Sequence, residues 1–98
     1  MSKWFYRFQD ALALRHREAY EKSLQSDHPI RVRGGMYYYK GYEINWGEER
    51  HKDYQWGYTL VSEWPTDWEF CRTKAECVSD IDGIIAYELS KVTGNNSI

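Results

Sequence analysis

The sequence predicts one small α+β domain: an N-terminal amphipathic helix, a three-stranded antiparallel meander and a C-terminal helix packed on the sheet. Apolar residues recur at helical spacing near both ends of the chain, over residues 1–26 and 73–93. Over residues 36–72, apolar and polar residues tend to alternate with a period of two, as in half-buried strands. A chain of 98 residues without an internal repeat has the length of a single domain, residues 1–98.

Residues 1–26 are predicted to form a basic helix. Ser2 can cap its N-terminus, and Phe5, Phe8 and Leu12 recur on roughly one face. Much of the remaining surface is basic, through Lys3, Arg7, Arg15, Arg17 and Lys22. Two interpretations stay open. The helix packs on its own sheet, or it docks in a groove of another protein through aromatic anchors on one face.

Residues 27–35 are predicted to form a linker or an edge strand. Pro29 ends the first helix, because the residue before a proline is pushed out of helical angles. Gly34 and Gly35 mark a flexible joint. Between them, Ile30–Arg33 alternates as an edge strand would, and its two arginines discourage pairing with another chain.

The sheet of residues 36–72 is predicted to contain strands at residues 36–46, 54–62 and 68–72. If alternation is unbroken along the first strand, its core side carries Met36, Tyr38, Tyr42, Ile44 and Trp46. Tyr37 and Tyr39 are then expected on the exposed face of the sheet.

Residues 73–93 are predicted to form the second helix. Thr73 and Glu76 form a capping box, in which a hydroxyl and a carboxylate each satisfy an orphan backbone N–H. A stripe at helical spacing is expected to cover the sheet, namely Ala75, Val78, Ile81, Ile85, Leu89 and Val92. Gly94 is the expected C-cap.

The chain is rich in aromatic residues and unevenly charged. It contains five Trp, nine Tyr and three Phe, more than a small core needs, so part of them is expected at the surface as interface anchors. Residues 1–40 carry eight Lys/Arg against four Asp/Glu, whereas residues 41–98 carry five against eleven. The pI near 5.9 argues against a general nucleic-acid coat. These features indicate a binding module.

No catalytic, cofactor-binding or metal-binding site is expected. The sequence contains neither a G-x-S-x-G nucleophile elbow nor a glycine-rich phosphate loop. His51, Lys52 and Asp53 are consecutive in a predicted hairpin loop, where neighbouring side chains point apart, and the three histidines lie in different predicted elements. Cys71 and Cys77 are predicted to be small buried hydrophobic residues. The protein is therefore not expected to be an enzyme.

The opening residues Met1 to Phe8, the run from Tyr37 to Tyr42, the length and the aromatic richness give the chain a family resemblance. It resembles small lambdoid-phage accessory proteins, in particular the anti-RecBCD proteins of the P22 recombination region. The resemblance implies a phage protein that binds the host RecBCD helicase-nuclease at its RecC subunit and changes its activity, so that phage DNA ends survive and recombine.

The expected location is the cytoplasm of the bacterial host cell. The first residues do not resemble a signal peptide, and no apolar segment approaches the length that spans a bilayer, so no membrane contact is expected.

Interface hot spots favour Trp, Tyr and Arg. The candidate partner-binding residues are Trp4, Phe5, Phe8 and Arg15 in the first helix, with Tyr37 and Tyr39 on the sheet. A host prolyl isomerase acting at Pro65 is a second candidate partner, because X-Pro bonds reach the cis form readily in tight turns.

Two other functions stay open. A protein that binds single strands or DNA ends would use Arg7, Arg15, Arg17, Arg31 and Arg33. A DNA-mimic inhibitor of a host restriction or CRISPR enzyme would use Glu43, Glu48, Glu49, Glu63, Asp67 and Glu69.

Overall fold

The computed structural model describes the backbone of residues 2–48, 52–63 and 68–96, and the side chains of residues 13–48, 52–62 and 68–91. The elements are α1 (Ser2–Ser23), β1 (Ile30–Arg33), β2 (Met36–Tyr39), β3 (Tyr42–Trp46), β4 (Trp56–Leu60), the 3-10 helix η1 (Val61–Glu63), β5 (Glu69–Cys71) and α2 (Lys74–Asn96). Within the described residues the strands form one antiparallel sheet of five, in the order β1-β2-β3-β4-β5. The α+β class and the meander are confirmed, and the predicted number of three strands is wrong.

Part of the difference is a hairpin inside the segment that was predicted to be one strand. Tyr39 pairs with Tyr42, so Lys40 and Gly41 form a two-residue turn between β2 and β3. Both turn residues have positive φ, 48° for Lys40 and 88° for Gly41. That combination is typical of a type I′ turn, whose twist matches the twist of the flanking strands.

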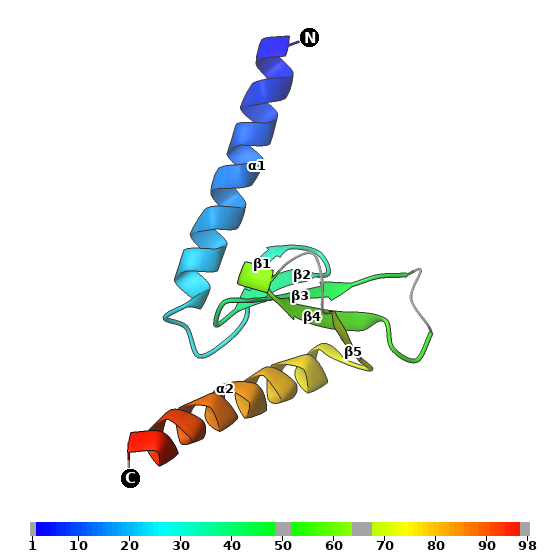
Figure 1. Ribbon diagram of the computed structural model, residues 1–98. Coiled ribbons are helices and arrows are strands. Elements are labelled where there is room, and N and C mark those ends of the chain that lie inside the picture. The colour runs from blue at the N-terminus through cyan, green and yellow to red at the C-terminus, as the bar shows by residue number, and fades with distance from the viewer. Residues whose placement is uncertain (1, 49–51, 64–67, 97–98) are drawn as a thin grey trace.

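The hairpin also changes which residues share a face of the sheet, because directly paired residues point to the same side. Tyr37 and Tyr39 lie on the same face as their partners Ile44 and Tyr42. That face is the one covered by α2 (Figure 1), so the expectation that Tyr37 and Tyr39 lie on an uncovered face is wrong.

The remaining strand is β1, which pairs with β2 at the edge of the sheet. Its register has an irregularity between Arg31 and Arg33, and Arg33 pairs with Met36 across a turn in which Gly35 has a φ of 76°. Residues 27–35 were predicted to form either a linker or an edge strand, and the structure confirms the edge strand.

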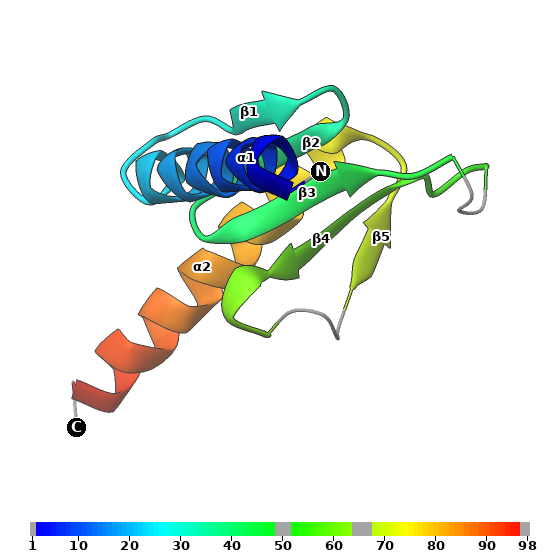
Figure 2. The ribbon, with the colours of Figure 1, turned by 90° about the horizontal axis from the view of Figure 1, so that it is seen from above.

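The two helices lie on opposite faces of the sheet, as Figures 1 and 2 show. On one face, buried residues of α1 and the first two strands pack together: Ala19, Val32, Met36 and Tyr38. On the other face, α2 and the last four strands bury Tyr39, Ile44, Tyr58, Cys71, Cys77 and Ile81. Both cysteines are thus buried, as predicted.

Helix α2 begins with the predicted cap, since the backbone N–H of Glu76 donates a hydrogen bond to the Thr73 hydroxyl at 3.1 Å. Its apolar stripe is predicted only in part. Ile81 is buried and Val78 and Ile85 pack against the core, as do Cys77 and Ile84, but Ala75 and Leu89 are exposed. The helix continues through Gly94 to Asn96, so the expected C-cap is wrong.

Candidate interaction surfaces

Helix α1 is held to the sheet by its C-terminal part. Nδ1 of His16 is hydrogen-bonded to the hydroxyl of Tyr38 at 3.0 Å, and the ring of Tyr20 meets the ring of Tyr38 edge to face at 5.8 Å. Ser23 is fully buried, and its carbonyl accepts a hydrogen bond of 3.1 Å from the backbone N–H of Lys40. The end of α1 is therefore fastened to the β2–β3 turn.

The other part of α1, residues 2–15, extends away from the sheet, and we call it the projecting half of α1 (Figure 1). The long axis of the molecule measures 61 Å, compared with 33 and 23 Å for the other two. Trp4, Phe5 and Phe8 belong to this half, and Arg15 at its base is exposed. The structure therefore separates these four candidate residues from the sheet.

Tyr39 was expected to be exposed, but it is buried. Only 2% of its surface is accessible, and its hydroxyl donates a hydrogen bond of 2.6 Å to Oδ1 of Asp82 on α2. Nζ of Lys40 donates to the same oxygen at 3.2 Å. The hydrogen bond from Tyr39 is the main cause that lowers the pKa of Asp82 below its ordinary value. Tyr39 is therefore a structural residue that joins the hairpin to α2.

Tyr37 is half-buried and belongs to a cluster of aromatic and basic residues. Nζ of Lys74 lies 4.2 Å from the centre of its ring, and the ring of Trp56 lies 6.3 Å away. Trp46, which pairs with Trp56, is exposed. Tyr37 thus borders the surface without projecting from it, and it is not brought together with the residues of the projecting half.

The expected surplus of aromatic residues at the surface is confirmed. The exposed rings among the described residues are Trp46, Tyr54, Phe70 and Tyr87. Tyr54 accepts a hydrogen bond of 3.2 Å from Nη2 of Arg72, whose guanidinium lies 5.3 Å from the centre of the ring. One exposed ring, that of Tyr54, therefore lies beside a cation.

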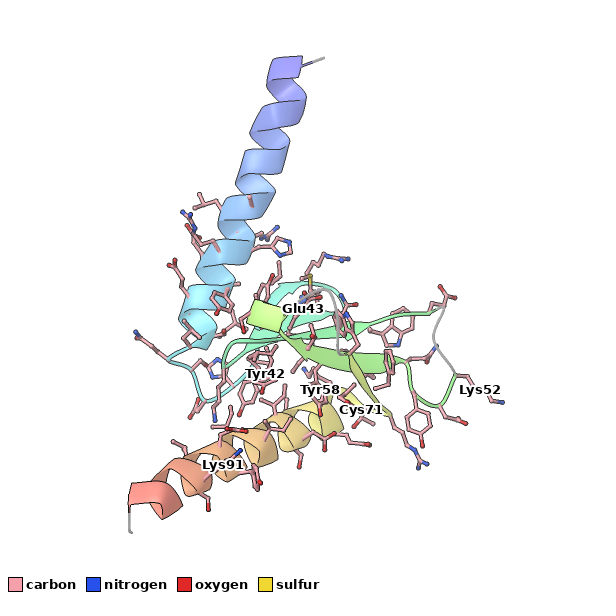
Figure 3. All side chains as sticks on the ribbon, viewed as in Figure 1. Tyr42, Glu43, Lys52, Tyr58, Cys71 and Lys91 are labelled. Atoms are coloured by element: carbon pink, nitrogen blue, oxygen red, sulfur yellow. The ribbon has the colours of Figure 1, made fainter. Side chains whose placement is uncertain are left out.

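A groove lies between α2 and the strands β4 and β5, and we call it the α2 groove. It consists of two adjoining cavities of about 550 and 410 Å³, which share Tyr58 and Ile84 in their walls. The walls also contain Tyr42, Thr59, Leu60, Glu69, Ser79, Asp80, Gly83, Tyr87 and Glu88. Figure 3 shows Tyr42 and Tyr58 on the side of the sheet that faces α2 and Glu43 on the opposite side.

The charged residues in the described lining of this groove are all acidic: Glu69, Asp80 and Glu88. Burial, followed by the charges of Asp80, Cys71 and Glu69, raises the pKa of Tyr58 to about 12. The sequence reasoning missed this site. Asp80, Ile84 and Glu88 recur every four residues along α2, which was the available signal, but their strand partners lie far away in the sequence.

The described residues include both cysteines of the chain. They contain no group of three or more His, Cys, Asp or Glu that could hold a metal ion. The thiol of Cys71 donates to Oδ2 of Asp80 at 3.4 Å, and burial raises its pKa well above the ordinary value, so the thiol stays protonated.

Among the described residues, no helix is both long enough and apolar enough to cross a bilayer. His51 and the Trp64–Pro65 bond lie outside the described residues, so the expectations about them stay predictions.

The fold and surfaces define the class of this protein as a small α+β domain with a five-stranded antiparallel meander between two helices, counted over the described chain. Comparison with protein-family models, with curated proteins and with solved structures finds no match.

Proposed function

We propose that this protein acts by binding another protein through the projecting half of α1, without covalent chemistry of its own. The resemblance described above suggests the partner, the RecC subunit of the host RecBCD helicase-nuclease. Binding would change the activity of this enzyme, protect phage DNA ends and favour phage recombination.

The observation that carries the proposal is the position of α1. Residues 2–15 leave the sheet, and their length as a helix is roughly 21 Å. An isolated helix of this size is marginal in water, because most helical stability in proteins comes from packing. A segment that contains Trp4, Phe5 and Phe8 therefore gains most from a groove on a partner, which is a common mode of helix recognition.

A binding measurement with purified RecBCD tests the proposal. We expect Trp4→Ala and Phe8→Ala each to weaken binding by about 2 kcal/mol, roughly thirtyfold, because aromatic anchors dominate such interfaces. Arg15→Ala should have a smaller effect. Leu24→Ala is the matched control, since Leu24 is an exposed apolar residue just beyond the end of α1. Unchanged affinity in both aromatic variants would refute the assignment.

Each of the two alternatives has a test of its own. Binding to labelled single-stranded oligonucleotides that falls steeply with added salt would favour the DNA-binding alternative. The DNA-mimic alternative has less support, since Glu43 pairs with Thr59 and Glu69 with Tyr58, which places these two carboxylates on opposite faces of the sheet. Inhibition of a restriction or CRISPR enzyme that is lost on reversing these charges would restore it.

A further inference from the structure

The α2 groove has the chemistry of a site for a basic, apolar segment. Its walls combine the rings of Tyr42, Tyr58 and Tyr87 with the aliphatic side chains of Leu60 and Ile84. Tyr87 is 65% exposed, so a large apolar surface there has no cover within the described residues. The acidic rim favours a cation, which can also lie over an aromatic ring.

The spacing of the groove fits a helix. Asp80, Ile84 and Glu88 occupy successive turns of α2, roughly 6 Å apart. The two cavities meet at Ile84, with Asp80 in the wall of one and Glu88 in the wall of the other. Trp4 and Phe8 are also four residues apart on a helix, so each could supply one anchor to one cavity.

The projecting half of α1 and the α2 groove carry opposite charges. The projecting half of α1 contains Lys3, Arg7 and Arg15 against one acidic residue, Asp10. The chain as a whole is divided in the same sense, basic before residue 41 and acidic after it. Complementary charge of this kind guides association and selects the partner surface.

The helix cannot reach the groove of its own chain. Residues 16–23 are packed on the face of the sheet formed with β1 and β2, and the groove lies on the opposite face beside α2 (Figures 1 and 2). An occupant with the sequence of α1 must therefore come from another molecule.

We propose that the projecting half of α1 of one copy docks in the α2 groove of a second copy, with its basic residues against Glu69, Asp80 and Glu88. The contact joins two different surfaces, so it is of the head-to-tail type. It goes beyond the proposed function, since it gives the projecting half a partner in the absence of the host protein.

Charge exchange tests the proposal in solution. The molar mass of the full chain is measured by sedimentation over a range of concentrations, at low and at high salt. We expect the wild type to associate, with an apparent dissociation constant that rises roughly tenfold on adding salt. The helix variant Arg7→Glu/Arg15→Glu and the groove variant Glu69→Lys/Glu88→Lys should each be monomeric, and an equimolar mixture of the two should associate again.

The control is Asp27→Lys/Glu48→Lys, which makes the same change of charge at two exposed residues outside the groove lining, and which should associate as the wild type does. Circular dichroism checks that every variant is folded. A monomeric wild type at all concentrations, association that survives both charge variants, or a mixture that stays monomeric would each overturn the proposal. Binding of the groove variant to RecBCD reports on the proposed function separately, because that variant leaves α1 intact.

Discussion

The two helices are attached to the sheet to different degrees. Helix α2 buries Cys77 and Ile81 completely, against large residues of the sheet such as Ile44 and Tyr58. Helix α1 contributes smaller buried residues, Ala19 and Ser23, from its last two turns, and the rest of the helix projects. The α2 side thus removes more apolar area from water in the described chain.

This difference teaches which part of the molecule provides stability. Hydrophobic stabilisation grows with buried apolar area, so the α2 side should hold the domain together. The α1 side depends on a smaller cluster and on a few polar contacts, and such units open locally at a lower free energy than the whole domain. The helix that we propose to bind a partner is therefore the less firmly attached of the two.

The largest loss of stability is expected on substituting Ile81, which has no accessible surface. Ile81→Ala should reduce the free energy of unfolding by about 3 kcal/mol, because it removes buried methylene groups and leaves a cavity. Val32→Ala on the α1 side removes two carbons instead of three and should cost about 1.5 kcal/mol, a reduction larger than the roughly 0.8 kcal/mol that one methylene explains. Urea unfolding measures both, and equal losses would contradict the proposed difference between the two sides.

A second effect concerns the hydrogen bond between Tyr39 and Asp82. Tyr39→Phe removes this bond to a half-exposed carboxylate and should cost about 1 kcal/mol at neutral pH. The pKa of Asp82 is lowered in the folded state, so its contribution is complete above the unfolded value of 3.8. It is lost as the pH falls through the lower folded value.

The pH dependence has its own control. Asp82→Asn removes the ionisable carboxyl group, so the variant should lose less stability than the wild type as the pH is lowered from 5. Acid titrations of unfolding compare the two chains. Parallel curves would show that Asp82 does not link the hairpin to α2.

The sequence predicts each helix to within a few residues but only part of the sheet, and the hairpin shows why. Alternation places residues 38 and 42 on the same side of a continuous strand, whereas a two-residue turn pairs residue 39 with residue 42. The turn is hard to recognise in the sequence, because every residue from Tyr37 to Tyr39 is a tyrosine and fits a core position. Gly41 was the available turn signal, and Lys40 with a positive φ is uncommon.

The α2 groove could not be predicted because it depends on how α2 crosses the sheet. Helical spacing identified Ile81, which is buried against the strands, but it also selected Leu89, which is exposed. Periodicity along one element carries no information about the angle at which it meets another. By contrast, the assignment of Trp4 and Phe8 to a helix needed only local sequence.

A third loss of stability should be confined to α1. Tyr38→Phe removes the hydrogen bond to His16 and should lower the free energy of local opening by about 0.5 to 1 kcal/mol. Faster amide hydrogen exchange is expected in residues 16–23, with unchanged protection of β3 and β4. Equal acceleration throughout the sheet would mean that α1 and the sheet open together, and α1 would then not be a separate unit.

The smallest effect is expected on the exposed side of α2. Tyr87 lies less than two turns beyond Ile81 on the same helix, yet 65% of its surface is accessible. Tyr87→Ala should change the free energy of unfolding of the dilute chain by less than about 0.5 kcal/mol, because exposed substitutions rarely exceed that. A loss that appears only at high protein concentration would place Tyr87 in a contact between copies. A loss above about 1 kcal/mol in the dilute monomer would mean that α2 is packed more evenly than the buried cluster around Ile81 implies.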